Sequence, residues 1–310
     1  MTLVQYEYIV AVDDYRHFAT AAQKCFVTQP TLSMQIQKLE EQLDVQIFDR
    51  AKHPVEPTEI GKKIIEQARI VLSEAKKITE LISDEKGTIE GDLRIGIIPT
   101  LSPYLLPLFV NTFVESHPSI HLEVQELITD QIIEKMDKGQ LDAGLFVTPS
   151  DNESLEEIPL FYEEFVAYVA PGDRLFKKLE LAPQDINLDD VWVLNEGHCF
   201  RNQVLNICKP RKSAGEKFRF ECGSLEALKK LVDHHSGITL LPELATIDMS
   251  EAELEKVRTF SDPVPVREVS LVVKKSFAKR GIVKALYETI KSSIPDDISS
   301  AKSGKVIKWR

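Results

Sequence analysis

Two cysteines that stand nine positions apart are the first candidates for chemistry in this sequence. Cys199 follows a histidine and Cys208 ends an apolar run, within the stretch NEGHCFRNQVLNIC, and the whole chain has four cysteines. Such thiols can be packing atoms, metal ligands, a stable disulfide or a redox switch. The segment lacks the paired short spacing of common zinc motifs, so we expect no metal site. Four cysteines are too few for a disulfide scaffold, which disfavours a stable bridge.

The surroundings of the two thiols differ. Cys208 fits the role of an ordinary small apolar residue in a core, and so do the two remaining cysteines. Cys199 instead stands at the predicted start of a helix, where backbone amide dipoles stabilise a thiolate. His198 and Arg201 are close to it in sequence. Spacing alone leaves the reactivity of Cys199 open.

Helical geometry limits what this pair of thiols can do. If the segment between them is helical, its ends lie roughly 13 Å apart, from about 1.5 Å per residue. A disulfide needs Cα atoms within about 7 Å. Bridging therefore requires the segment to unwind and Cys208 to leave its apolar surroundings. Oxidation would then favour one packing and reduction the other, and strain would make the bridge easier to reduce.

The composition indicates a soluble globular protein of two or three domains, because 43% of its 310 residues are hydrophobic and 28% are charged. No apolar run approaches the roughly 20 residues of a membrane span. The N-terminus MTLVQYEYIV has no basic region followed by a long apolar core, so we expect a cytoplasmic protein. The net charge of −11 disfavours nucleic acid as a partner unless a local surface supplies the contacts.

Such a local surface is predicted in residues 1–57, which read as short helices with tight connections. The third helix has Thr28 as its cap and Pro30 in its first turn, and helix, short turn, helix is a DNA-binding arrangement. FDRAKHPVEP then reads as a wing. The third helix begins with uncharged side chains that have hydroxyl or amide groups, which can contact DNA bases or phosphates. The alternative is that these side chains form an ordinary helix face exposed to solvent. The DNA-binding residues that we predict are Thr28, Gln29, Pro30, Thr31, Ser33, Gln35, Lys38, Arg50 and Lys52.

Residues 58–87 are predicted to form one long linker helix. Apolar residues recur along it in steps of four and three, which is the period of a two-helix coiled coil. We therefore expect a dimerisation helix; the alternative is a helix that lies on its own domain. The apolar positions are Ile64, Ala68, Val71, Ala75, Ile78 and Ile82.

From residue 92 short apolar strands alternate with helices, which predicts an α/β fold with largely parallel sheets. We expect a regulatory domain at 88–295, made of two α/β subdomains that face a cleft. Their bounds are about 88–162 plus 266–295, and 163–265. We expect the tail, residues 296–310, to be disordered. The predicted strands are LRIGIIP, HLEVQEL, LDAGLFV, VWVLN, FRFEC, ITLLP and EVSLVVKK.

The stretch FATAAQKCFVTQPTLSMQIQKLEEQLDVQIFDR, followed by PTEIGKKI, resembles the winged helix-turn-helix of LysR-type transcriptional regulators. The resemblance continues through the linker helix into a two-lobed effector domain like that of periplasmic binding proteins. It implies a dimer of dimers on partly palindromic double-stranded DNA, working with RNA polymerase. Two positions depart from the family pattern. Asp44 replaces a usual glycine, and Met34 stands where many members have a basic residue.

The segments GHCFRNQVLNIC, IPTLSPYLLP, CGSLEAL and SGITLLPELA resemble the peroxide-sensing LysR subgroup, the OxyR family. That resemblance implies that Cys199 attacks hydrogen peroxide and becomes a sulfenic acid, which Cys208 resolves to a disulfide. The dimer would then change its DNA contacts at antioxidant-gene promoters. Glutaredoxin- or thioredoxin-type systems would reset it. The resemblance implies no cofactor and no enzymatic turnover.

A peroxide site follows from the same resemblance. Thr100 and Thr129 each sit at a predicted strand-to-helix junction, where α/β folds bind ligands, although simple helix capping is the alternative. His198 would polarise the site, and Arg267 would stabilise the thiolate and the leaving hydroxide. Asn202 departs from the aspartate of many members, and an amide cannot take a proton as a carboxylate does.

Three other functions compete with this one. A LysR-type regulator that senses a metabolite in the cleft would not need the paired cysteines. A thiol peroxidase would share the chemistry but has no use for a helix-turn-helix. A solute-binding protein would share the two-lobed fold but not the N-terminal domain.

Overall fold

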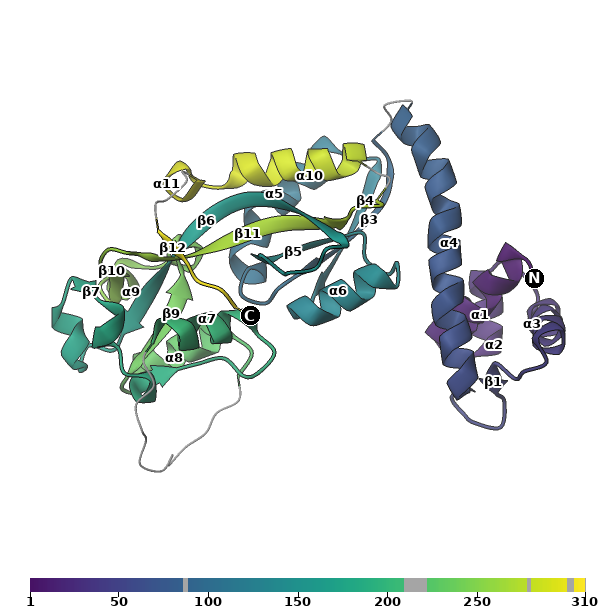
Figure 1. Cartoon of the computed structure of the whole chain (residues 1–310), viewed down its shortest axis with the longest axis horizontal. Coiled ribbons are helices and arrows are strands. Elements are labelled where there is room, and N and C mark those ends of the chain that lie inside the picture. Colours follow the sequence, from purple (N-terminus) through teal and green to yellow (C-terminus); the bar gives the residue numbers. More distant parts are fainter. Residues whose placement is uncertain (86–88, 209–221, 278–279, 300–303, 310) are drawn as a thin grey trace. The chain divides into compact units, whose positions relative to one another are not determined.

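The computed structural model of the chain describes residues 1–85, 89–208, 222–277, 280–299 and 304–309. The chain forms two compact units (Figure 1). One is Met1–Lys86 with Asp137–Gly139, and the other is Gly87–Met136 with Gln140–Arg310. None of the helices in the described part is long and apolar enough to cross a membrane.

The first unit has the predicted helix-turn-helix followed by a short hairpin. Thr28 caps the third helix, because its side chain accepts a hydrogen bond from the backbone N–H of Thr31. Leu32, Ile36 and Leu39 lie on the buried face of this helix, in the core of the unit. The elements are α1 (Leu3–Tyr15), α2 (Phe18–Lys24), α3 (Gln29–Leu43), and the antiparallel strands β1 (Phe48–Asp49) and β2 (Glu56–Pro57).

The linker helix α4 (Glu59–Glu85) packs partly on its own unit. Thr58 caps its start, accepting a hydrogen bond from the Gly61 N–H at 3.0 Å. Ala68 of the predicted dimer seam lies in the core that α1 and α3 form, which agrees with the alternative interpretation at that position. Ile78 is 66% exposed, so it is free to contact a second helix. The side chain of Ile82 lies outside the described residues.

The second unit is built on a mixed sheet of ten strands within the described residues. β3 pairs in parallel with β4 and β5, whereas β11 pairs antiparallel with β5 and β6. The expectation of largely parallel sheets is therefore wrong for the centre of the sheet. The strands are β3 (Gly91–Ile97), β4 (Ile120–Glu126), β5 (Ala143–Thr148), β6 (Leu155–Val169), β7 (Glu180–Leu181), β8 (Val191–Trp192), β9 (Ile238–Pro242), β10 (Val257–Phe260), β11 (Pro265–Lys274) and β12 (Lys305–Val306).

The long strand β6 was not predicted, because four glutamates interrupt its apolar pattern. The structure explains two of them. Glu163 is fully buried and pairs with Arg267 on the neighbouring strand β11, and Glu157 accepts hydrogen bonds from Ser150. The predicted strand FRFEC lies outside the described residues except for Cys222.

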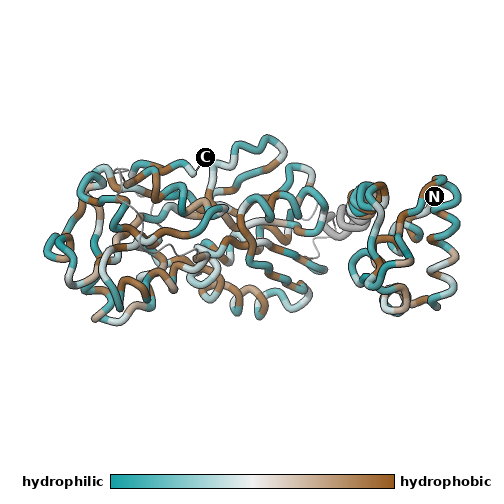
Figure 2. Tube along the Cα trace, turned by 90° about the horizontal axis from the view of Figure 1, so that it is seen from below, coloured by the Kyte–Doolittle hydropathy of each residue, from teal (hydrophilic) through white to brown (hydrophobic). Residues whose placement is uncertain are grey.

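Two hydrophobic cores lie along the sheet, and the long strand β6 contributes side chains to both (Figure 1). Figure 2 shows hydrophobic residues along the central strands of this unit. The first core includes α5 (Ser102–Ser116), α6 (Thr129–Asp137) and α10 (Arg280–Ser293), and the second includes α7 (Cys199–Ile207) and α8 (Leu225–His234). Short helices complete the unit: η1 (Arg174–Lys177), η2 (Pro183–Asp185), η3 (Leu188–Asp190), η4 (Glu243–Thr246), α9 (Glu251–Leu254) and α11 (Asp296–Ser299). Division of this unit into subdomains at about 88–162 plus 266–295, and 163–265, stays a prediction.

Two glycines seat α6 closely on the sheet. A Cβ at Gly96 of β3 or at Gly144 of β5 would lie 2.8 Å from the side chain of Ile132. The missing side chains let α6 approach the strands, and α6 begins with Thr129, a predicted site residue.

The expected disorder of the C-terminal tail is wrong for its described residues. β12 pairs in parallel with β11, with Val306 opposite Val266. Ile307 and Trp309 are buried, at 8% and 6% exposure. Ile307 and Trp309 are two positions apart in an extended segment, so both side chains lie on its buried side, while Lys308 between them faces outward.

Candidate functional site

The two cysteines of the pair mark the ends of α7, so the segment between them is helical, the case considered from the sequence. His198 precedes the helix as its N-terminal cap residue, Cys199 is the first helical residue, and Cys208 follows the last one. Both thiols are free and buried, Cys199 in the first core and Cys208 in the second. Nine residues of helix hold the Cα atoms roughly 13 Å apart, too far for a disulfide in this conformation.

The sulfur of Cys199 faces Thr129, whose hydroxyl donates a long hydrogen bond of 3.9 Å to Sγ. Burial raises the pKa of the Cys199 thiol; the positive charge of Arg267 and the Thr129 hydroxyl oppose this shift but do not cancel it. The amides at the helix start also favour the thiolate, as expected, and burial again outweighs them. Burial alone raises the pKa of Cys208 to about 12.

Arg267 is fully buried and fixed by a cross-strand ion pair. Its Nε donates to the Glu163 carboxylate at 2.8 Å, and a terminal N–H group lies 2.6 Å from the same oxygen. Two more N–H groups reach Thr100, at its hydroxyl (3.0 Å) and at its carbonyl oxygen (3.2 Å). The guanidinium also lies 5.2 Å from the ring centre of Phe200, which follows Cys199 in the chain. The structure thus brings Thr100 and Arg267 together beside the start of α7.

Glu163 is a site residue that the sequence reasoning missed. Its second oxygen accepts a hydrogen bond from the Leu244 N–H at 3.1 Å, so the carboxylate is held from two sides. Glu163 and Arg267 are direct neighbours in the β6–β11 register. They are 104 residues apart in the chain, and only the pairing of the strands places them together.

The structure gives His198 and Asn202 different surroundings. His198 is buried, and burial lowers its pKa, so the imidazole is neutral at pH 7. A Cβ at Gly223 would lie 3.3 Å from His198 Nε2, so this glycine makes room for the ring. Asn202 is exposed on α7, and its amide donates to the carbonyl oxygen of Trp309 at 3.0 Å. Its predicted contact with peroxide stays a prediction.

On the helix-turn-helix, the predicted DNA-binding residues lie on the accessible side of α3 and on the hairpin. Gln35 receives a hydrogen bond from the Gln5 side chain at 3.4 Å, so α1 fixes it. Arg50 and Lys52 are exposed but ion-paired, with Glu40 and Glu56 respectively. The exposed residues are Thr28, Gln29, Pro30, Lys38, Arg50 and Lys52, and the half-buried ones are Thr31, Ser33 and Gln35.

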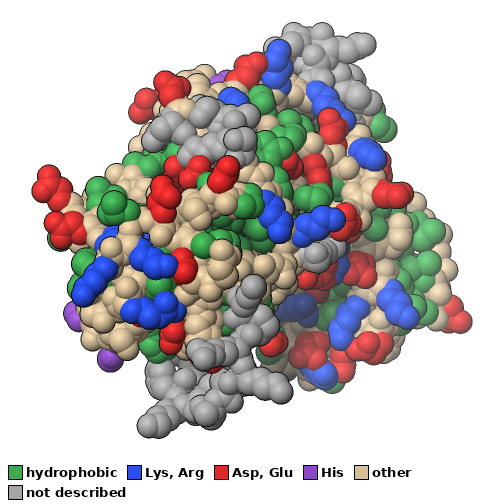
Figure 3. All heavy atoms as spheres, turned by 60° about the vertical axis from the view of Figure 1, so that its left-hand side comes forward, with side chains coloured by type: hydrophobic (Ala, Val, Ile, Leu, Met, Phe, Trp, Pro, Cys, Tyr) green, Lys and Arg blue, Asp and Glu red, His purple; other side chains and the backbone are tan. Residues whose placement is uncertain are grey.

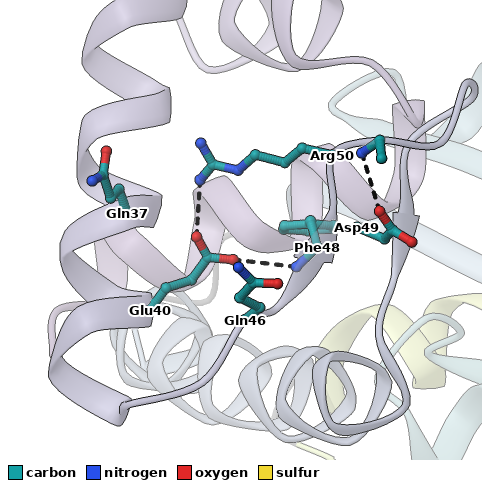
Figure 4. Close-up of a pocket in the computed structure, with 7 residues that line it drawn as sticks. Gln37, Glu40, Gln46, Phe48, Asp49 and Arg50 are labelled. Carbon is teal, nitrogen blue, oxygen red and sulfur yellow. Dashed lines mark hydrogen bonds and ion pairs between the residues drawn. The ribbon is translucent and has the colours of Figure 1, made fainter.

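A pocket of about 460 Å³ lies between the end of α3 and β1 (Figure 4). Glu40 is its central residue, and one carboxylate oxygen accepts hydrogen bonds from the N–H groups of Ile47 (2.8 Å) and Phe48 (3.2 Å). The other oxygen binds Arg50 at 2.9 Å. Glu40, which the sequence reasoning also missed, therefore orients Arg50 and fixes the turn after α3. Within that turn Asp44 has a φ of 53°, a conformation that explains why the family prefers glycine there.

The turn between α2 and α3 carries Phe26, which is 96% exposed and has a φ of 56°. Its place next to Thr28 puts an aromatic side chain at the edge of the predicted DNA-binding surface. On the face of the second unit that Figure 3 shows, acidic and basic side chains are interspersed. Among the described residues, no group of three or more His, Cys, Asp or Glu side chains is placed to hold a metal ion.

Comparisons with known proteins agree on one family. Residues 3–62 match the model of the bacterial regulatory helix-turn-helix protein, lysR family, and residues 86–294 match the LysR substrate binding domain. The hydrogen peroxide-inducible genes activator of Haemophilus influenzae is 34% identical over 98% of this chain and 99% of its own length.

Solved structures of relatives show the same fold. A cysteine-to-aspartate variant of full-length OxyR from Pseudomonas aeruginosa has a TM-score of 0.77 and 31% identity, covering 98% of this chain and 100% of its own. A cysteine-to-serine variant of Corynebacterium glutamicum OxyR, with hydrogen peroxide bound, has a TM-score of 0.59 and 27% identity, and covers 94% of each chain.

Proposed function

The chain belongs to the LysR family of bacterial helix-turn-helix regulators and to its OxyR subgroup, and on that basis we propose that it is a transcriptional regulator that responds to hydrogen peroxide. One observation supports this most directly. A buried thiol, Cys199, begins a helix beside a fixed arginine and two threonine hydroxyls, and a second buried thiol follows that helix.

The first chemical step is oxidation of Cys199. Its thiolate attacks one oxygen of hydrogen peroxide; an S–O bond forms, the O–O bond breaks, and hydroxide leaves to become water after protonation. The sulfur loses two electrons and becomes a sulfenic acid. In the second step the Cys208 thiolate attacks this sulfur, the S–S bond forms, the S–O bond breaks, and a second hydroxide leaves. Two thiols and one peroxide give one disulfide and two water molecules.

The contacts of Arg267 and Thr129 support the roles that we propose for them in the peroxide site. The positive charge of Arg267 favours the thiolate and the leaving hydroxide, and Glu163 with Thr100 holds the guanidinium in place. Thr129 donates to the sulfur. The Thr100 hydroxyl, the neutral imidazole of His198 and the Asn202 amide would hydrogen-bond the peroxide oxygens.

The conformational step follows from the length of α7. Its ends must approach from roughly 13 Å to within about 7 Å, so the helix has to unwind before the bridge closes. Cys208 leaves the second core in this change. The refolded segment would reorient the subunits of a dimer of dimers and alter their contacts with antioxidant-gene promoters, and with RNA polymerase there. Glutaredoxin- or thioredoxin-type reductants in the cytoplasm would restore the thiols.

Intact and peptide mass spectrometry tests this function on the reduced full-length protein, before and after a small excess of peroxide. We expect a loss of two hydrogens that maps to a Cys199–Cys208 link. Cys199→Ser abolishes the reaction, and Cys208→Ser leaves a sulfenic acid that a dimedone-type probe traps.

Cys222→Ser is the matched control, because Cys222 is buried in the same core as Cys208 but lies outside the proposed pair. If Cys199 and Cys208 stay reduced, the redox function is refuted and a metabolite in the effector domain becomes the function to test.

A further inference from the structure

The C-terminal segment lies along the cysteine helix and is joined to it by three amide side chains. Three successive backbone carbonyls of the segment accept these hydrogen bonds. The pairs are Gln203 Nε2 with Ile307 O at 2.7 Å, Asn206 Nδ2 with Lys308 O at 2.9 Å, and Asn202 Nδ2 with Trp309 O at 3.0 Å.

These three bonds require α7 to be helical. Positions 202 and 206 are one turn apart and 203 is adjacent, so a helix places all three side chains on one face. An extended segment would send neighbouring side chains to opposite sides and spread the three amides over more than twice the length. The tail therefore recognises the helical form of the segment between the cysteines.

The tail has anchors besides its three hydrogen bonds with α7. β12 pairs with β11, where Val306 lies opposite Val266, the residue before Arg267. Ile307 is buried in the second core and Trp309 in the first. The carbonyls are thus presented from a fixed backbone, which makes the contact with α7 specific.

We propose that residues 305–309 act as a latch that holds α7 helical and sets how fast Cys208 resolves the sulfenic acid of Cys199. This inference rests on the proposed redox function. Because the bridge cannot close across an intact helix, the three amide bonds have to break before the S–S bond forms. Loss of the Asn206 bond alone leaves the oxidation of Cys199 unchanged, since Asn206 lies at the far end of α7 from that sulfur.

The latch also affects the equilibrium between the dithiol and the disulfide forms of the cysteine pair. It binds the reduced, helical form and not the bridged form, so it stabilises the dithiol. Its removal moves the reduction potential of the pair to more negative values, which makes the disulfide harder to reduce. A single neutral hydrogen bond accounts for a factor of about 2 to 12 in such an equilibrium.

The test compares two rates in the full-length protein: formation of sulfenic acid and formation of disulfide, by rapid acid quench and mass spectrometry. Asn206→Ala removes one latch bond at an exposed position. Asn111→Ala, at an exposed position of α5, is the matched control. We expect Asn206→Ala to speed disulfide formation by about 2- to 12-fold with an unchanged rate of sulfenic acid formation. Asn111→Ala should alter neither rate.

A truncation after Ser303 should have a larger effect, but it also removes two buried side chains and can impair folding. Hydrogen exchange of α7 amides in reduced Asn206→Ala protein therefore provides a second measurement, without peroxide, and we expect faster exchange near residue 206. If the wild type forms the disulfide and Asn206→Ala forms it at the same rate, the latch is overturned and the redox function stays intact. Failure of the wild type to form the disulfide refutes the redox function, and the proposed role of the latch with it.

Discussion

Replacement of Arg267 by methionine should destabilise the second unit strongly. Arg267 and Glu163 are both fully buried, with a shortest N–O distance of 2.6 Å. Removing one member of a buried ion pair leaves an uncompensated charge and costs about 3–5 kcal/mol in the free energy of unfolding. The Thr100 hydroxyl and carbonyl also lose their donors. We therefore expect Arg267→Met to lose at least about 3 kcal/mol.

The double variant Glu163→Gln with Arg267→Met distinguishes charge from packing. Glutamine keeps an oxygen for the Leu244 N–H but carries no charge, so the double variant should be more stable than Arg267→Met alone. Arg280→Met is the control, because Arg280 pairs with Glu156 at 2.6 Å but both side chains are at least 40% exposed. An exposed pair of this kind contributes about 0–1 kcal/mol.

Urea unfolding followed by tryptophan fluorescence measures these differences, since both tryptophans of the chain, Trp192 and Trp309, lie in the second unit. The reasoning is refuted if Arg267→Met costs no more than Arg280→Met, or if the double variant is no more stable than Arg267→Met. At equal folding, Arg267→Met should also react more slowly with peroxide, because the charge that favours the Cys199 thiolate is gone.

Three further predictions concern reactivity and DNA binding. Because burial raises the pKa of Cys199, its thiolate fraction should increase about tenfold per pH unit across neutral pH, and stopped-flow oxidation rates should follow; a plateau below pH 7 would contradict this. Lys38→Ala should weaken DNA binding about equally for all sequences and lower the salt slope by about 1, whereas Lys284→Ala should alter neither in the same titration. Gly61→Ala should lower the melting temperature of the first unit and its DNA affinity, because the new Cβ would lie 2.0 Å from the Ile47 carbonyl oxygen; Gly172→Ala, which meets nothing within 4 Å, should be neutral in calorimetry.

The proposed mechanism links stability and function in one element. α7 carries the two thiols at its ends, receives the tail on one face, and places Phe200 against the guanidinium of Arg267. Any change that loosens α7 should therefore alter the response to peroxide even where it touches neither cysteine.

Local sequence by itself determined much of this protein. The cap at Thr28 and the apolar stripe of α3 act within one or two helical turns, so they predicted the helix-turn-helix. The helical spacing of Cys199 and Cys208 depends only on the rise per residue, so the need to unwind α7 was also predictable. The resemblance to a known family supplied Thr100, Thr129 and Arg267, and the structure places all three around the start of α7.

Tertiary structure alone decided the features that join distant segments. Glu163 meets Arg267 only because β6 and β11 pair in one register, and the glutamates of β6 conceal that strand from any local pattern. The pKa of Cys199 depends on how deeply the core covers it, which outweighs the helix dipole that the sequence does reveal. The tail has a polar composition, and its order comes from strand pairing with β11 and burial of Ile307 and Trp309, contacts that no neighbouring residue encodes.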